Sequence, residues 1–413
     1  MSTSPRRIRR RGIRHRGTAV AFAAVLTAAM GLATACSGPG KPVGPSPVTT
    51  GTQPSSAASA SSASGSPGAS GSPTASGKSK PVFIIYYLWW DHSHWTSHLG
   101  PDYPATAPTD PLPATLNSSS CGTSSDYKGS QLTDVSQGLA YDQSKYSTIL
   151  GDVREAAATG ATGFAVNWIG TGSANQTTSS AADDQRLAYV FQAVQAVNRE
   201  GIPFKIILDY QSSAKRLPMS QFYGDFTYFL KTYGDSPYLD HTYSPKPEVV
   251  MSGTWKYPDT DIEYISENFR PRMYLIGDEK PSSWDAARAE YLDGTSYYFS
   301  SQNPYTNPTS FAQLVKFAKT VREVKNPDGS AKTWLAPFTP GYNATLLYGT
   351  PTCVPRDDGQ TMHKIYDGNL ATDPDGWTLI SWNEISEGSY IVPLTRYGDL
   401  YTNTLADIIR TGR

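Results

Sequence analysis

The stretch that decides the fold begins with Ala161-Thr162-Gly163-Phe164-Ala165-Val166-Asn167-Trp168 and ends with Pro203-Phe204-Lys205-Ile206-Ile207-Leu208-Asp209. Both runs are short, apolar at successive positions and rich in β-branched or aromatic residues, which is typical of strands buried on both faces. Between them, residues 184–200 carry apolar side chains at helical spacing. This strand–helix–strand order predicts a parallel sheet covered by helices.

The same alternation extends along residues 81–413. We predict strands at residues 81–88, 161–168, 203–209, 248–252, 272–277, 295–299, 332–338 and 377–382. We predict helices at residues 144–159, 184–200, 220–233, 262–269, 283–288, 310–324, 360–369 and 399–410. Eight strands with intervening helices indicate an α/β fold, a single (β/α)8 barrel of the TIM type. The alternative is an open doubly wound sheet, which fits less well because no glycine-rich phosphate loop follows the first strand.

The N-terminal 80 residues have a different character. Residues 1–17 are arginine-rich without acids, the next stretch is small and apolar, and Ala33-Thr34-Ala35-Cys36 closes it. This pattern predicts a signal peptide of the bacterial lipoprotein type over residues 1–35, with lipid on Cys36. An ordinary signal peptide or an uncleaved anchor are the alternatives. Residues 36–80 are almost entirely Ser, Gly, Ala, Pro and Thr, so we expect a disordered linker that tethers the domain to the outer face of the cell membrane.

The composition limits the kind of partner. The chain has 35 Lys and Arg against 36 Asp and Glu, and much of the positive charge lies in the leader. The domain is therefore acidic and shows no basic stripe, which argues against nucleic acid. Aromatic rings stack on the C–H faces of sugars, so the 26 tyrosines and nine tryptophans favour a polysaccharide or oligosaccharide substrate. We expect a monomer.

The last predicted strand runs into two carboxylates. Trp377-Thr378-Leu379-Ile380-Ser381-Trp382-Asn383 leads to Glu384, and Glu387 follows three residues later. Carboxylates beside aromatic rings are unfavourable unless a site uses them. Cleavage of a glycosidic bond needs two such groups, one as proton donor and one as base or nucleophile. We therefore predict Glu384 and Glu387 as catalytic residues; acids that favour the first turn of a helix are the alternative.

A barrel brings the carboxyl ends of its strands and the following loops to one rim. The aromatic, acidic and amide residues in those positions are candidates for substrate contact: Tyr87, Trp89, Trp95, Trp168, Asp209, Trp255, Tyr342 and Asn383.

The cysteines and histidines give two further expectations. With Cys36 lipidated, Cys121 and Cys353 remain, in the loops after the first and seventh strands. An extracytoplasmic pair tends to form a disulfide, and loops from nearby strands can meet above the rim. His92, His94 and His98 are loosely spaced and have no acid-rich partner segment, so we expect no metal and no cofactor.

Several segments resemble glycoside hydrolase family 99. Tyr86-Tyr87-Leu88-Trp89-Trp90 with His94-Trp95 is similar to the family's opening, and residues 160–168 resemble its second strand. Pro340-Gly341-Tyr342-Asn343 resembles the segment before its last strand. Trp382-Asn383-Glu384-Ile385-Ser386-Glu387-Gly388 resembles its Asn-Glu-Trp-His-Glu-Gly signature, with Ile385-Ser386 in place of Trp-His. Residues 387–391 are also similar to family 71 of α-1,3-glucanases.

The resemblance implies a (β/α)8 barrel that cleaves α-linked mannosides within a chain with retention. It implies that Glu384 is the base that deprotonates the neighbouring 2-hydroxyl, giving an anhydro-sugar, and that Glu387 is the general acid/base. The altered motif leaves mannan and glucan open as substrates. Two other classes also remain open: an inactive surface protein that binds glycans, and a structural lipoprotein of the cell envelope.

Overall fold

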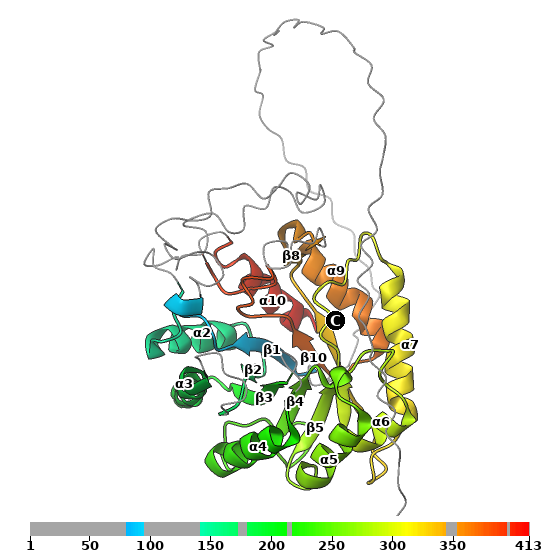
Figure 1. Ribbon diagram of the computed structural model, residues 1–413. Coiled ribbons are helices and arrows are strands. Elements are labelled where there is room, and N and C mark those ends of the chain that lie inside the picture. The colour runs from blue at the N-terminus through cyan, green and yellow to red at the C-terminus, as the bar shows by residue number, and fades with distance from the viewer. Residues whose placement is uncertain are drawn as a thin grey trace, which may run out of the picture. The chain divides into compact units, whose positions relative to one another are not determined.

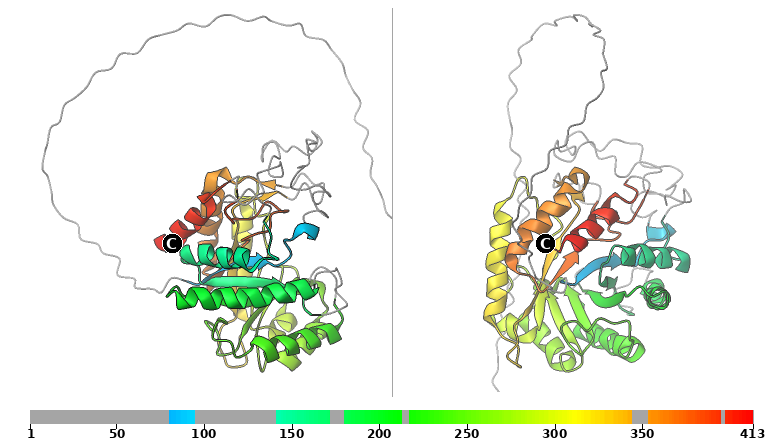
Figure 2. Two further views of the ribbon diagram at one scale, coloured as in Figure 1. Left: turned by 90° about the vertical axis from the view of Figure 1, so that its left-hand side faces the viewer. Right: turned by 180° about the vertical axis from the view of Figure 1, so that it is seen from behind.

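Eight parallel strands close into a barrel, and helices surround it (Figures 1 and 2). The computed structural model describes residues 80–94, 141–171, 180–212, 217–343, 353–394 and 397–412. These residues belong to one compact unit, residues 74–413. The predicted leader and, apart from Lys80, the predicted linker lie outside the described residues, so both assignments stay predictions.

The strand order confirms the predicted (β/α)8 barrel. The strands are β1 (Val82–Tyr87), β2 (Gly163–Trp168), β3 (Lys205–Gln211), β4 (Glu248–Ser252), β5 (Tyr274–Asp278), β6 (Gly294–Ser296), β7 (Thr333–Phe338) and β10 (Gly376–Leu379). Each pairs in parallel with the next, and β10 closes the ring by pairing with β1, Val82 opposite Trp377. The open-sheet alternative is thereby excluded.

The helices follow the strands along the chain and cover the outside of the barrel (Figure 1). They are α2 (Tyr146–Ala158), α3 (Ser180–Arg199), α4 (Met219–Tyr233), α5 (Asp259–Phe269), α6 (Ala286–Tyr291), α7 (Thr309–Glu323), α9 (Gln360–Asn369) and α10 (Leu400–Thr411). Short α6 begins after Asp285, whose side chain caps it by accepting from the Arg288 N–H. Within the described ranges, none of the helices is long and apolar enough to cross a bilayer.

Two local features differ from the sequence-based expectation. Strand β10 ends at Leu379 rather than Trp382, and the Ile380–Ser381 peptide bond is cis. The chain still follows its neighbours there, because the Trp382 N–H donates to the Ile85 carbonyl at 2.8 Å. After β7, the two-residue strands β8 (Tyr342–Asn343) and β9 (Cys353–Val354) form an antiparallel hairpin that the sequence pattern did not reveal.

Side chains alternate between two cores. Along β1, Phe83, Ile85 and Tyr87 point into the barrel, while Ile84 and Tyr86 pack against the helices. The interior core contains Phe83, Ile85, Tyr87, Ala165, Ile207, Val250, Tyr274, Ile276, Leu335 and Ile380. Burial on both faces explains why the strands are continuous apolar runs.

A polar layer lies inside the barrel at the carboxyl ends of the strands. Two residues after Ala165, Ile207, Val250 and Ile276, the strands carry polar side chains on the same interior face. We call these four residues the polar layer: Asn167, Asp209, Ser252 and Asp278. This layer forms the floor of the candidate site.

Candidate functional site

Glu384 and Glu387 lie in the turn that follows β10, at the carboxyl end of the barrel. Glu384 is buried and Glu387 is half-buried. The Glu384 N–H donates to the Ser381 hydroxyl at 2.7 Å, and the Ser386 hydroxyl donates to the Glu384 carboxylate at 2.7 Å. The turn therefore fixes both the backbone and the carboxyl group of Glu384.

The two carboxyl groups are electrostatically coupled. Burial and, second, the negative charge of Glu387 raise the pKa of Glu384 to about 8. Hydrogen bonds from Ser386 and from backbone amides oppose the shift. A pair of this kind titrates as a unit and retains one proton at neutral pH. It can thus present a proton donor and a carboxylate at the same time.

Two tyrosines connect the pair to the barrel wall. The Tyr87 hydroxyl donates to the Tyr298 hydroxyl at 3.0 Å, and the Tyr298 hydroxyl donates to the Glu387 carboxylate at 3.4 Å. Burial and the charges of both glutamates raise the pKa of Tyr87 well above its usual value. Burial, Tyr87 and the same charges act likewise on the pKa of Tyr298. Both hydroxyls therefore stay protonated and can donate hydrogen bonds.

Beneath this group, Asp209 forms the centre of the polar layer. Its carboxylate accepts hydrogen bonds from Asn167 at 2.7 Å and Ser252 at 2.5 Å. Burial raises the pKa of Asp209 to about 7, although both hydrogen bonds lower it. Asp278 accepts from the backbone N–H groups of Gly253 and Tyr298, each at 2.9 Å.

A small cavity of about 10 Å³ joins the polar layer to Tyr298. It is lined by Ile85, Ala165, Asp209, Val250, Ser252, Asp278, Ser296, Tyr298 and Thr378. Tyr298 links the floor to the glutamate pair, because it lines this cavity and its hydroxyl donates to the Glu387 carboxylate.

An aromatic stack rises from the end of β1 beside the site. The Tyr87 and Trp89 rings stack at 4.3 Å, and the Trp89 and His94 rings stack at 5.6 Å. Trp89 is half-buried, so part of its surface is open to solvent. Trp95, also predicted here, lies outside the described residues.

Two further predicted residues lie in loops after other strands. Trp255 follows β4 in the 3₁₀ turn Thr254–Lys256, half-buried, with the Lys280 ammonium 3.3 Å from its ring centroid. Tyr342 lies half-buried on β8 and lines a hollow of about 250 Å³ beside the hairpin. Both have the partial exposure that a sugar platform requires.

Trp168 is placed differently from the prediction. It is fully buried in the outer layer, where its ring packs against Tyr210, Tyr228 and Phe229. Because side chains alternate along β2, its neighbour Asn167 faces the interior instead. Trp168 therefore supports the barrel wall and does not reach the interior site.

Asn383 also differs from the prediction of a substrate contact. It is fully buried, and its side-chain amide bonds to both backbone groups of Tyr87 and to the Tyr141 hydroxyl. Its backbone carbonyl accepts from the Trp90 indole at 2.6 Å. Asn383 thus joins β1 to the turn that carries Glu384.

The described residues include only some of the cysteines and histidines for which we made predictions. Cys353 is disulfide-bonded, but Cys121 lies outside the described residues, as does Cys36, so the pairing and the lipidation stay predictions. Among the described residues, no group of three or more His, Cys, Asp or Glu side chains could hold a metal ion. His94 packs between the rings of Trp89 and Trp90.

Four interior residues were not among the predicted substrate contacts: Tyr298, Asn167, Ser252 and Asp278. Three of them interrupt an apolar strand two positions after an inward-facing residue, and that spacing is a usable signal once the inward face is known. Tyr298 lies two residues after the end of β6, in a segment with weak strand character.

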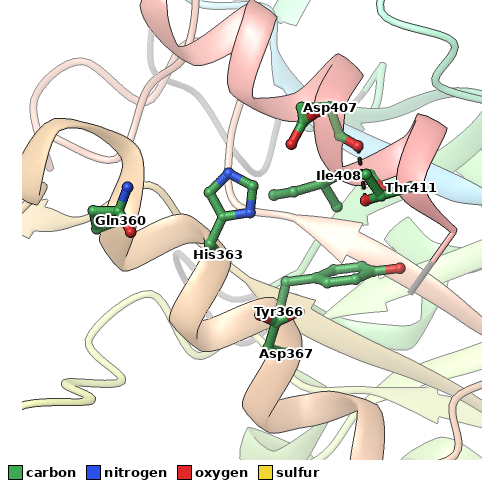
Figure 3. A pocket seen from close by; sticks show the side chains of 7 residues that line it. All are labelled: Gln360, His363, Tyr366, Asp367, Asp407, Ile408 and Thr411. Atoms are coloured by element: carbon green, nitrogen blue, oxygen red, sulfur yellow. Dashed lines mark hydrogen bonds between the residues drawn. The ribbon is translucent and has the colours of Figure 1, made fainter. Parts of the chain in front are cut away.

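A separate hollow of about 290 Å³ lies in the helix layer between α9 and α10. Figure 3 shows the His363 imidazole projecting from α9 toward α10, where the Thr411 hydroxyl donates to the Asp407 carbonyl at 2.9 Å. Its lining residues do not overlap with the glutamate pair or the polar layer, so this hollow is not part of the candidate site.

Comparisons with known proteins agree with this architecture. No known family profile matches the sequence, and no curated protein matches it. Among solved structures, the glycoside hydrolase family 99 endo-alpha-mannosidase from Bacteroides thetaiotaomicron is similar, with 17% identity and a TM-score of 0.56 over 80% of this chain and 98% of that one. A structure of the same enzyme with BIS-TRIS-propane gives 16% identity and a TM-score of 0.57 over the same shares.

A glycoside hydrolase-like protein is also similar, with 11% identity and a TM-score of 0.54 over 80% of this chain and 94% of that one. At these identities, the likeness establishes the fold. The barrel of this chain has the fold of glycoside hydrolase family 99, as the sequence motifs led us to expect.

Proposed function

We propose that this protein is a glycoside hydrolase that cleaves an α-linked polysaccharide, an α-mannan or an α-glucan. The observation that carries the proposal is the coupling of Glu384 and Glu387 in one site, where both charges act on the same two tyrosine hydroxyls. The site lies at the carboxyl end of a barrel, where TIM-barrel enzymes have their catalytic groups. Similarity in fold to an endo-alpha-mannosidase adds support.

The chemistry requires one proton on the pair. The carboxyl that holds it protonates the leaving oxygen, while the other acts as base. By similarity of motif, Glu384 removes the proton of the sugar's 2-hydroxyl, whose oxygen then attacks the anomeric carbon as the leaving oxygen takes a proton from Glu387. Glu387 next takes a proton from water, which attacks the anomeric carbon and opens the anhydro-sugar with overall retention, while Glu384 returns its proton to the 2-oxygen.

The free protein favours the proton on Glu384, because burial disfavours its charged form. The assignment by motif therefore requires that bound substrate shift the proton to Glu387. A retaining enzyme in which Glu384 is the acid is the alternative division of labour.

The partly exposed aromatic residues supply sugar contacts in this proposal. Trp89, Trp255 and Tyr342 are half-buried in the segments that follow β1, β4 and β7, and Tyr87 contributes a hydroxyl bonded to Tyr298. Asp209 lies deeper in the barrel. In this proposal its carboxyl group forms hydrogen bonds with sugar hydroxyls, either directly or through its polar-layer partners Asn167 and Ser252.

The test is hydrolysis of defined α-mannans and α-glucans by residues 81–413, followed as new reducing ends. Wild type should release them, and Glu387→Gln should lose about 10²–10⁴-fold in rate, as expected for a missing general acid. Undiminished activity of Glu387→Gln would exclude its assigned role. Saturable glycan binding without turnover across a broad panel would instead establish the alternative, an inactive surface protein that binds glycans.

We further propose that the enzyme is held at the outer face of the cell membrane by lipid on Cys36. The basic leader, the small residues before Cys36 and the polar linker after it support this placement. Cys36→Ser should move the full chain from the membrane fraction to the medium. Retention of this variant in the membrane would indicate an uncleaved anchor.

A further inference from the structure

Arg356 lies next to the turn that carries Glu387, although it belongs to the segment after β9. Its guanidinium donates hydrogen bonds to the carbonyl of Gly388, at 3.1 Å, and to the carbonyl of Tyr390. It thereby holds the chain one and three residues after Glu387.

The same guanidinium is enclosed by aromatic rings. Its central carbon lies 4.7 Å from the Tyr390 ring centroid, 4.4 Å from that of Tyr397 and 4.3 Å from that of Tyr401. Contacts of a cation with ring faces stabilise it most when water is excluded, and Tyr390 and Tyr401 are fully buried. Arg356 is therefore held rigidly and can act as a fixed support.

The hairpin of β8 and β9, which precedes Arg356, forms a hydrogen bond with the backbone of Glu387. The Asn343 N–H on β8 donates to the Glu387 carbonyl at 2.7 Å. Gly388 has a φ of +61°, and a Cβ there would lie 3.2 Å from the Asn343 backbone nitrogen and oxygen. A side chain at this position would need both a left-handed backbone and a small shift of the hairpin, so glycine favours this close approach.

Glu387 is consequently fixed from two sides. Its backbone is held by Asn343 and, through Gly388 and Tyr390, by Arg356, while its carboxylate accepts from Tyr298 inside the barrel. We propose that Arg356 is a positioning residue that holds the Glu387 carboxyl in its working position beside Glu384. The proposal rests on the proposed glycosidase function. A lysine cannot replace this arginine, because an ammonium cannot stack flat on rings while it donates two directed hydrogen bonds.

The kinetic test compares Arg356→Lys and Arg356→Gln with wild type on the glycan that wild type cleaves. Displacement of a catalytic group by about 1 Å can reduce the rate on the order of 100-fold. We expect kcat to fall about 10–100-fold in both variants, with KM changed by less than about threefold. Arg322→Lys is the matched control, because Arg322 on α7 also donates to two carbonyls, those of Thr372 and Asp373. Its kcat should stay that of wild type.

A second measurement needs no substrate. With ¹³C-labelled glutamate, NMR titration follows the Glu384 carboxyl, whose signal is assigned by its loss in Glu384→Gln. If Arg356→Lys lets Glu387 move away, the midpoint of Glu384 should fall by about 0.5–1 unit, because the raising effect of a like charge weakens with distance.

Wild-type kcat and an unshifted Glu384 midpoint in Arg356→Lys would overturn the proposal. Loss of the folded state in every Arg356 variant, judged by circular dichroism, would also overturn it and assign Arg356 to stability alone. If wild type cleaves no glycan, the proposed function fails, but the titration still decides whether Arg356 positions Glu387.

Discussion

The side chain of Asn383 pairs with both backbone groups of Tyr87. Its carbonyl oxygen accepts from the Tyr87 N–H at 2.8 Å, and its amide nitrogen donates to the Tyr87 carbonyl at 2.9 Å. These two bonds replace the ladder bonds that β10 would make to the end of β1 if the strand continued beyond Leu379. One amide therefore sets the position of Tyr87 relative to the turn that carries Glu384.

Asn383→Ala should destabilise the fold. Removal of the amide leaves the buried Tyr87 N–H without its side-chain acceptor, at a cost of about 1–3 kcal/mol, while the Tyr87 carbonyl still accepts from the Gln143 amide at 2.7 Å. The free energy of unfolding, measured by urea denaturation, should fall accordingly. Asn268→Ala is the control, because the Asn268 amide donates to a helix carbonyl at an exposed position. Equal stability of the two variants would contradict the role of Asn383.

The two glutamates should respond differently to the leaving group. An acidic phenol departs without protonation, so a variant that lacks the general acid should recover most of its kcat/KM on an aryl α-glycoside. A variant that lacks the base should lose about the same factor on aryl glycoside and polysaccharide. We expect recovery in Glu387→Gln and none in Glu384→Gln. The reverse pattern would exchange the roles of the two residues.

The pH dependence of kcat/KM should show an alkaline limb near the pKa of the coupled pair. Burial and Glu387 raise the pKa of Glu384 to about 8, so the pair loses its last proton above that pH, and no acid remains to protonate the leaving oxygen. We expect kcat/KM to fall as pH rises beyond about 8. The limb should persist in Asp209→Asn, and its disappearance there would show that Asp209 causes it.

Asp209 should make stability depend on pH. Burial raises its pKa to about 7 in the folded state, so between pH 4 and 7 the folded chain binds more protons than the unfolded chain, and stability falls as pH rises. This linkage amounts to about 4 kcal/mol at most, from a shift of about three units. Asp209→Asn removes it.

The unfolding free energy of Asp209→Asn minus that of wild type should therefore increase from pH 4.5 to pH 8. The exposed Asp235 provides the control substitution, Asp235→Asn. A difference that stays constant over this range for Asp209→Asn would show that Asp209 is ionised in the folded protein throughout.

The strands were predictable because their signal is local. Burial on both faces demands short apolar runs, and β2 and β3 show them plainly. For the same reason, the inward face could not be predicted, since an apolar run looks alike from both sides. Trp168 was chosen over Asn167 on the strength of its ring, and the structure turns that ring outward.

The other features that the sequence did not predict depend on tertiary contacts. Tyr298 reaches Tyr87 across 211 positions of sequence, and Asn383 reaches Tyr87 across 296. No local pattern encodes either contact. The hairpin of β8 and β9 has two residues in each strand, too few to show any alternation. The glutamate pair was predictable because the two residues share one short motif.

The polar layer sets a limit on how robust this barrel can be. Valine and leucine at positions 167, 209, 252 and 278 would remove buried amide and carboxyl groups that are difficult to desolvate, and would fill the small void above them. Such a redesign should melt at a higher temperature, yet its interior would offer nothing for a sugar to hold. The same four side chains would therefore lower the melting temperature and, in the proposed function, supply the hydrogen bonds to the sugar.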